Sequence, residues 1–144
     1  MPRLLSDPNV RLLLRVDLLL VLMMMIAGNY TSLQRLQSRV FATPEDYRMR
    51  GLPEAGPDEE VERARRVHQN HIENVLPFFV VSLLYLLTGP SHMALSLFLW
   101  GFLAARVLYS IFYIRAMQPH RTIAFTVGAM LMTAMAVIAL SASV

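Results

Sequence analysis

The sequence predicts an all-α protein, a transmembrane bundle of four helices that forms a single domain over residues 1–144. Hydrophobic residues make up 56% of the chain and charged residues only 16%, a balance typical of a membrane protein. Four long apolar stretches are separated by two polar loops and one tight turn. The chain has no cysteine, which excludes disulfides, thiolate metal sites and a cysteine nucleophile.

The first helix is expected at about residues 10–39. Its apolar run, Leu12 to Gly28, is interrupted only by Arg15 and Asp17 and, with the residues that follow, is long enough to span a hydrocarbon core of about 30 Å. A secretory signal peptide is the alternative, because basic residues precede a short apolar core. The helical pattern continues to Arg39, which favours a permanent helix.

The second helix is expected at about residues 59–88. Before it, Val40 to Glu60 is rich in proline and glycine, which predicts a loop. Three consecutive acids at the end of this loop can cap the helix and favour its first turn. Pro77 lies inside the helix and should kink it, which transmembrane helices tolerate.

The third and fourth helices are expected at about residues 92–115 and 121–142. The segment Gly89 to Ser91 contains glycine and proline and predicts a tight reversal before the third helix. A short second loop, Met117 to His120, precedes the fourth helix.

The distribution of arginine orients this bundle, because cytoplasmic loops carry an excess of basic residues. Arg115 and Arg121 flank the second loop, whereas the Gly89 to Ser91 turn and the C-terminal tail have no basic residue. The arginines in or beside the first loop are Arg35, Arg39, Arg48, Arg50, Arg63, Arg65 and Arg66. We therefore expect both loops in the cytosol and both termini outside it, although Arg3, Arg11 and Arg15 argue weakly the other way.

A polar stripe on the second helix is the first candidate site. Arg66, Asn70, Glu73 and Pro77 share one face at about 100° per residue, and the stripe runs into an apolar segment. A cation, an amide and a carboxylate on one face can hold a small zwitterion. The alternative is an amphipathic helix end whose charges pair at i,i+3 or i,i+4 spacing in water.

The third helix carries a second polar face. Arg106, Tyr109 and Tyr113 follow one another at i, i+3 and i+7, with Ser110 beside them. An arginine inside a membrane span needs a partner, and Glu73 is the nearest unexplained carboxylate by depth. These residues form either a structural Arg106–Glu73 pair or the lining of a polar pocket between the two helices.

Two further arginines lie near the same end of the expected bundle. Arg121 opens the fourth helix, where a helix N-terminus already favours anions, and Arg35 lies near the end of the first helix. The alternative for Arg121 is a residue that marks the membrane edge and binds lipid headgroups. His68 and His71 lie near Glu73 but lack a third ligand and the usual i,i+4 spacing, so we expect no metal site.

Several motifs resemble the MAPEG family of membrane-associated eicosanoid and glutathione enzymes. The longest is VERARRVHQNHIENVLPF, followed by LLYLLTGPS, and the others are FATPED from Phe41, AARVLYSIFY and QPHRT. They occur in the family's order over roughly residues 30 to 130. The match is closer to the family's glutathione transferase branch than to its prostaglandin E synthase branch.

The resemblance implies a homotrimer of four-helix protomers in the endoplasmic reticulum or the mitochondrial outer membrane. Glutathione would bind at each protomer interface near the cytosolic side, and the partners would be a hydrophobic electrophile or lipid and membrane lipids, with no nucleic acid. The implied activity is conjugation of glutathione, as its thiolate, to lipophilic electrophiles, with reduction of lipid hydroperoxides as a second activity. The alternatives are a glutathione-dependent prostaglandin E synthase and a non-catalytic lipid-presenting scaffold.

The resemblance also implies the roles of individual residues. The glutathione-binding positions would be Arg35 from a neighbouring protomer, Arg66, His68, Asn70, Glu73, Arg106, Ser110 and Tyr113. The catalytic positions would be Arg121, which stabilises the thiolate, Thr122 beside it, and Asp46, which matches an acid implicated in prostaglandin synthase chemistry.

Four residues depart from the family's pattern. Gln69 stands where prostaglandin synthases have arginine, and Tyr109 stands where relatives have histidine. Phe125 replaces the tyrosine of the prostaglandin branch, as it does in the transferase branch, and His71 replaces an aspartate. These differences weaken the prostaglandin synthase hypothesis and leave the electrophile open.

Overall fold

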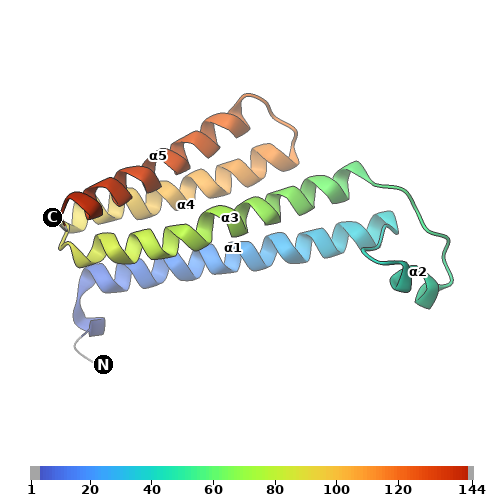
Figure 1. Ribbon diagram of the computed structural model, residues 1–144, viewed down its shortest axis with the longest axis horizontal. Helices are drawn as coiled ribbons and strands as arrows, with labels where there is room; N and C mark the ends of the chain where they lie inside the picture. Colours follow the sequence, from blue (N-terminus) through green and yellow to red (C-terminus); the bar gives the residue numbers. More distant parts are fainter. Residues whose placement is uncertain (1–3, 143–144) are drawn as a thin grey trace.

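The computed structural model describes residues 4–142, and within this range it contains helices and no strand, as the sequence predicts. Four long helices lie side by side, and the short helix α2 lies beyond them at one end (Figure 1). The start of α1, the α3–α4 turn and the end of α5 share the opposite end. The elements are a 3-10 turn at Leu4–Ser6, α1 at Pro8–Ser38, α2 at Pro44–Arg50, α3 at Glu59–Leu87, α4 at His92–Ile114 and α5 at His120–Ser141.

Local sequence signals set both ends of α1. Asp7 is the N-cap, and its side chain accepts a hydrogen bond from the Asn9 backbone N–H at 2.7 Å. Pro8 follows at the first helical position, where its missing N–H costs nothing. The helix ends at Arg39, whose left-handed backbone (φ 55°) lets its N–H bond to the carbonyl of Arg35.

The expectation of an uninterrupted loop between the first two long helices is wrong for Pro44–Arg50, which form α2. Proline begins this helix, two acids lie in its first turn, and two arginines lie in its last, so the charges complement the helix dipole. Gly51 ends it with φ 64°. Tyr47 fixes α2 to the chain before it, because its buried hydroxyl accepts a hydrogen bond from the Phe41 N–H at 2.9 Å.

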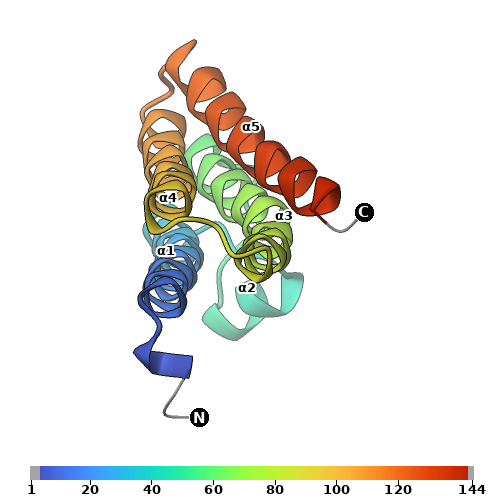
Figure 2. The same cartoon turned by 90° about the vertical axis from the view of Figure 1, so that its left-hand side faces the viewer.

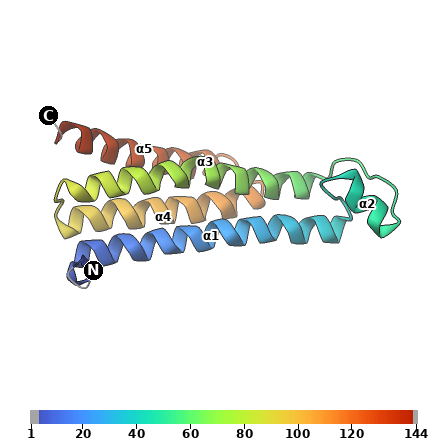
Figure 3. The same cartoon turned by 60° about the horizontal axis from the view of Figure 1, so that its bottom comes forward.

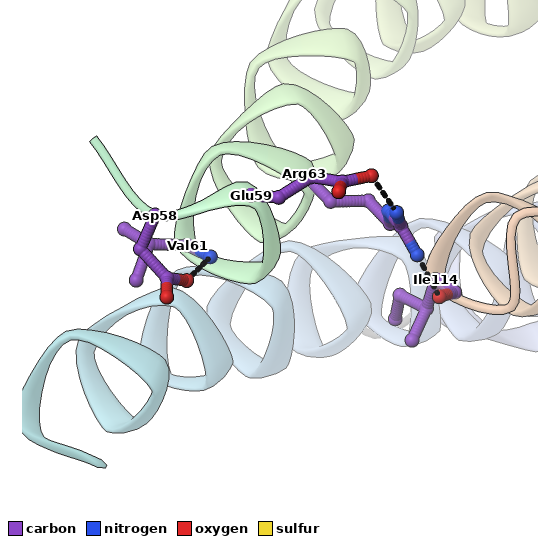
Figure 4. A network of polar contacts seen from close by, with 5 residues as sticks. All are labelled: Asp58, Glu59, Val61, Arg63 and Ile114. Carbon is purple, nitrogen blue, oxygen red and sulfur yellow. Dashed lines mark hydrogen bonds and ion pairs between the residues drawn. The ribbon is translucent and has the colours of Figure 1, made fainter. Parts of the chain in front are cut away.

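Helix α3 is capped by Asp58, whose Oδ1 accepts from the Val61 N–H at 2.9 Å (Figure 4). The helix continues through Pro77 to Leu87. Together with α1 it extends past the end of α4 and the start of α5 toward α2 (Figure 3). The end of the molecule that carries α2 is therefore formed by α1 and α3, and neither α4 nor α5 reaches it.

The core lies where the long helices face one another. Helices α3 and α4 contact each other and both contact α1 and α5, while α5 runs obliquely across the other helices (Figure 2). The rings of Phe78 in α3 and Phe102 in α4 stack with centroids 3.8 Å apart and an angle of 6° between their planes. The fully buried apolar side chains around them include Val16, Leu20, Val75, Leu95, Leu99 and Met135.

Three helices within residues 4–142, namely α3, α4 and α5, are long and apolar enough to cross a membrane. Helix α1, which carries Arg15 and Asp17 in its apolar run, is not among them. Large apolar side chains such as Leu18, Leu87 and Leu140 remain exposed on the outer surface. Such a surface would aggregate in water and suits a lipid environment.

Candidate functional site

Arg106 lies fully buried in α4 and joins three helices. Its Nη1 donates a hydrogen bond to Asn70 Oδ1 of α3 at 3.1 Å, and its Nη2 donates to the Phe125 carbonyl of α5 at 3.5 Å. Its Nε is also buried and makes no hydrogen bond with the described part of the chain. Burying a cation that has one unpaired N–H donor costs free energy. Arg106 is therefore a candidate anion-binding residue.

Aromatic rings surround the Arg106 guanidinium. Its Cζ lies 5.4 Å from the ring centre of Phe102, 5.2 Å from that of Tyr109 and 5.4 Å from that of Phe125. A cation at this distance from an aromatic face is stabilised by about 0.5 to 2 kcal/mol, depending on desolvation. The aromatic faces thus compensate part of the hydration that the buried guanidinium has lost.

Gly128 of α5 makes room for the guanidinium. A Cβ atom at this position would lie 2.9 Å from Arg106 Nη2 and 3.3 Å from its Nε. Real side-chain carbons do not approach nitrogen this closely, so glycine lets α5 pack directly on the charged group.

The hypothesis of a structural Arg106–Glu73 pair is wrong. Glu73 is exposed and accepts a hydrogen bond from Gln69 Nε2 at 3.1 Å, while the Asn70 amide takes the position next to Arg106. Asn70 lies nearly one turn before Glu73, on the side of α3 that faces α4. A neutral amide costs less to desolvate than a carboxylate, so it can pair with the buried cation at lower cost.

A row of rings leads from Arg106 to the start of α5. The centroids of Tyr109 and Tyr113 lie 5.5 Å apart, and the Arg121 Cζ lies 4.4 Å from the centre of the Tyr113 ring. We call the set Asn70, Arg106, Tyr109, Tyr113 and Arg121 the polar row. It crosses from α3 over α4 to α5 and carries a cation near each end.

The side chain of Gln118 fixes Arg121 and Thr122 at the first turn of α5. With its amide oxygen toward Arg121, Gln118 accepts hydrogen bonds from Nη2 and Nε of that guanidinium, the second at 3.0 Å. In the same orientation its amide nitrogen donates to Thr122 Oγ1 at 3.0 Å. An anion near this turn would meet a positioned cation and the positive end of a helix dipole.

His71 has no role in the glutathione site predicted from the sequence, yet it packs next to the polar row. It is fully buried, and its Nε2 lies 2.7 Å from Ser110 Oγ. Ser110 donates its own hydroxyl proton to the Arg106 carbonyl at 2.9 Å, so His71 Nε2 is the donor to Ser110. The apolar periodicity of α3 carries the missing signal, because His71 lies four residues after Val67 and four before Val75, on the buried face.

The charged start of α3 divides into paired and unpaired residues. Arg65 pairs with Glu62 at 2.7 Å, and Arg63 pairs with Glu59 while its Nη1 donates to the Ile114 carbonyl of α4 at 3.2 Å (Figure 4). Arg63 and Arg65 thus pair at i,i+4 and i,i+3 spacing, as expected for the charged end of an amphipathic helix. Arg66 is exposed and makes no close ion pair within residues 4–142, although its charge acts on the Glu62 carboxylate four residues earlier.

The remaining sequence-predicted residues lie apart from the polar row. Arg35 is half-buried at the end of α1, with an Nε that has no hydrogen-bond partner in the described chain. The His68 ring packs against Gly28 of α1, where a Cβ would lie 3.2 Å from it. Asp46 accepts a hydrogen bond from Thr43 Oγ1 within the α2 region at 3.2 Å.

The structure therefore brings together Asn70, Arg106, Ser110, Tyr113 and Arg121, with Thr122 joined through Gln118. It leaves Arg35, Asp46, His68, Arg66 and Glu73 out of direct contact with this group inside the single chain. Among residues 4–142 no three histidine, aspartate or glutamate side chains lie close enough to hold a metal ion.

Comparison with known proteins identifies relatives over most of the chain. The sequence model of the MAPEG family matches residues 15–141. The protein named microsomal glutathione S-transferase 1 of Rattus norvegicus is 40% identical over 111 residues, covering 73% of this chain and 72% of the relative. The human protein of that name is 39% identical over the same shares. Human prostaglandin E synthase is 30% identical over 125 residues, covering 85% of this chain and 82% of the relative.

Proposed function

Because this chain belongs to the MAPEG family, we propose that it is a membrane-bound glutathione transferase that conjugates glutathione to lipophilic electrophiles. Glutathione is a small peptide with two carboxylates, one amine and one thiol. It needs cations for its carboxylates, an acid for its amine and an activated position for its sulfur. The name and the 40% identity of the transferase relatives support this activity over the others in the family.

The polar row is the observation that carries the proposal. It joins an arginine buried at 0% exposure to a second arginine at the start of α5 through two tyrosine rings. A lipid-facing bundle does not need this arrangement for stability, because buried charges are costly to desolvate. The arrangement is suited to a ligand with several charges.

Glutathione binding also recruits the exposed residues of α3. Arg66 would meet a carboxylate of glutathione, and Glu73 would meet its amine, since both side chains are exposed on the helix. Arg35 would be supplied by a neighbouring protomer across the interface of a homotrimer. Exposed apolar residues on the same face of α3, such as Leu76 and Val80, support burial of this face by another copy.

Arg121 activates the thiol in this proposal. The thiolate is the nucleophile, and a free thiol with a pKa of about 8.5 is mostly protonated at neutral pH. A guanidinium and a helix N-terminus near the sulfur favour the thiolate and lower that pKa. Because Gln118 donates to Thr122 Oγ1, the Thr122 hydroxyl proton is left to donate to the sulfur.

The proposed reactions follow from this thiolate. In conjugation, the sulfur forms a bond to the electrophilic carbon, and the leaving group departs with its bonding electron pair. In peroxide reduction, the sulfur attacks one peroxide oxygen, an alcohol leaves, and a second glutathione converts the sulfenic acid to a disulfide and water. The exposed apolar outer surface gives both kinds of lipophilic substrate a route from the membrane.

We place the four long helices across a membrane, with both loops and the polar row near the cytosolic face. The arginines beside the two loops support this orientation. The endoplasmic reticulum fits relatives named microsomal, and the mitochondrial outer membrane is the alternative location.

A glutathione-dependent prostaglandin E synthase is the second candidate, supported by the 30% identity to the human enzyme of that name. Asp46 would take part in that chemistry, yet it lies in the α2 region and contacts Thr43 instead of the polar row. The third candidate is a lipid-presenting scaffold without catalysis.

Glutathione binding to the purified protein in detergent tests the proposal, together with turnover of a chromogenic aryl halide. We expect binding at millimolar glutathione or below, and a conjugate that forms only when both substrates are present. The Arg106→Met variant, which removes the buried cation, should lose both activities while the exposed-residue control Arg48→Gln keeps them. Absence of glutathione binding would support the scaffold, and binding with conversion of prostaglandin endoperoxide but no conjugation would support the synthase.

A further inference from the structure

A second polar pocket lies far from the polar row, at the opposite end of α4. It is a cavity of about 340 Å³ between the start of α1 and the start of α4. The residues that line it are Pro8, Arg11, Leu12, Arg15, His92, Ser96 and Trp100. None of these residues has a role in the proposed transferase reaction.

Hydrogen bonds hold the two walls of this pocket together. Asn9 Nδ2 of α1 donates to the Pro90 carbonyl at 3.1 Å, and its Oδ1 lies 2.7 Å from His92 Nδ1. Because the Asn9 amide nitrogen faces a carbonyl, its oxygen must accept a proton from His92 Nδ1. The imidazole orientation is therefore fixed, and His92 forms a wall of the pocket that is tied to α1.

The charge on the pocket is uncompensated. Arg11 and Arg15 lie one turn apart on α1, and neither makes an ion pair or side-chain hydrogen bond within the described residues 4–142. Among the described residues no carboxylate lines the cavity, and the nearby Asp7 uses its Oδ1 to cap α1. The N-termini of α1 and α4 both open here, so two helix dipoles add positive potential to two guanidinium groups.

The deeper part of the pocket is apolar. His92, Ser96 and Trp100 follow one another at i, i+4 and i+8 on α4. The side chains that line the pocket therefore become less polar from His92 toward Trp100. Trp100 is 46% exposed, and the neighbouring surface carries the exposed side chains of Leu14 and Leu97. Tryptophan and arginine are the residues that mark a membrane–water interface.

We propose that this pocket binds the phosphate headgroup of an anionic membrane lipid, with its acyl chain lying along Trp100. The two arginines meet the phosphate oxygens, and the Trp100 ring meets the first part of the chain. A headgroup with net negative charge is preferred over a zwitterionic one, because no acid in the pocket would bind a choline cation. The site lies in the leaflet opposite the α2 loop, so it is separate from glutathione binding.

Trp100 gives a direct readout, because it is the single tryptophan of the chain. The full-length protein is placed in mixed micelles with phosphatidylglycerol or phosphatidylcholine whose acyl chains carry bromine, which quenches tryptophan on contact. We expect the anionic lipid to reach half-maximal quenching of Trp100 at a mole fraction on the order of tenfold lower than the zwitterionic lipid, since each arginine near an anionic headgroup strengthens binding about fivefold. The preference should fall with added salt, which screens charge.

Variants separate this pocket from general electrostatic attraction. Arg11→Gln with Arg15→Gln should remove the lipid preference but leave quenching by both lipids. The matched control, Arg48→Gln with Arg115→Gln, removes the same charge at exposed positions near the other end and should keep the preference.

Three outcomes would overturn the proposal. The first is equal quenching of the parent protein by the two lipids, and the second is loss of the preference in the control variant. The third is displacement of the brominated lipid by millimolar inorganic phosphate, which would assign the pocket to a free anion.

Discussion

Arg106 shows at the level of one residue how a cation is accommodated inside an apolar bundle. Its charge is met by an amide oxygen, a carbonyl and three aromatic faces, and no carboxylate of residues 4–142 is in contact with it. Each of these groups is neutral, so the guanidinium keeps a net charge that a bound anion can use. A paired Arg106–Glu73 would have cancelled that charge and left less attraction for glutathione.

Replacing Arg121 by leucine should separate binding from activation. We expect glutathione affinity to remain largely unchanged, while the pH at which the thiolate forms rises by about one unit, which costs about 1.4 kcal/mol. The sign follows because a cation stabilises the charged thiolate, so its loss favours the thiol and moves turnover to higher pH. Thiolate absorbance in the ultraviolet, measured against pH on the bound complex, checks this.

Arg115→Leu is the matched control for this experiment, since Arg115 is exposed at the end of α4, just before the α4–α5 loop, and lies outside the polar row. A folded Arg121→Leu protein with an unshifted thiolate profile would assign activation to another group, with Arg106 and Tyr113 the next to test.

Replacing Glu73 by glutamine should weaken glutathione binding without unfolding the protein. The carboxylate is exposed, and the introduced amide oxygen still accepts from Gln69, so the free energy of unfolding should change by less than about 0.5 kcal/mol. Loss of a charge-assisted bond to the glutathione amine should lower the affinity about tenfold. Calorimetric titration measures the affinity, with Glu60→Gln as the control on the same helix. Unchanged affinity would remove Glu73 from the site.

At the scale of helices, the approach of α5 to α4 depends on Gly128. Gly128→Ala should push the guanidinium away from Asn70, because the added Cβ would lie 2.9 Å from Arg106 Nη2. Overpacking of this kind costs about 1 to 3 kcal/mol, and glutathione binding should weaken with it. Thermal unfolding and glutathione titration measure the two effects.

Gly101→Ala is the control for Gly128→Ala, since its Cβ would meet the flexible end of Leu131 at 3.1 Å instead of a charged group. We expect it to keep glutathione binding. Equal loss of binding in both variants would show that general helix packing, and not the position of the Arg106 guanidinium, determines the glutathione affinity.

Arg63 links the start of α3 to the end of α4. Its bond to the Ile114 carbonyl holds the chain just before the α4–α5 loop (Figure 4). Arg63→Gln should lose about 0.5 to 1.5 kcal/mol from this bond and speed hydrogen exchange of residues 114–119. Arg65→Gln breaks only a contact within α3 and should leave that segment unchanged. Equal exchange in the two variants would contradict the anchoring role.

For the molecule as a whole, hydropathy and arginine placement predict membrane orientation. A tag after the C-terminus should be protected from protease added to the cytosolic side of sealed vesicles, while the α2 loop should be cleaved. Solubilised vesicles, in which the tag becomes accessible, supply the control. Digestion of the tag in sealed vesicles would reverse the orientation and move the polar row away from the cytosol.

The helical class and the family could be predicted from the sequence, because apolar runs and ordered motifs are local features. The pairing of Arg106 could not, since Asn70 and Glu73 are less than one turn apart and spacing alone does not say which of them faces α4. The role of Gly128 could not be predicted either, because it depends on how closely α5 approaches α4. Helix α2 was missed, since proline and glycine suggested a loop although they also begin and end a short helix.

The guanidinium beneath Gly128 also favours one alignment of α5 along the bundle. If α5 shifted by one residue, Val127 or Ala129 would take the place of the glycine, and a side-chain carbon would meet the charge. The close packing of α5 on Arg106 therefore favours the axial position that places glycine over the guanidinium. An insertion in the α4–α5 loop leaves the spacing between Arg121 and Gly128 unchanged. A single residue inserted between these two positions would instead rotate Arg121 by about 100° relative to Gly128, out of line with Tyr113.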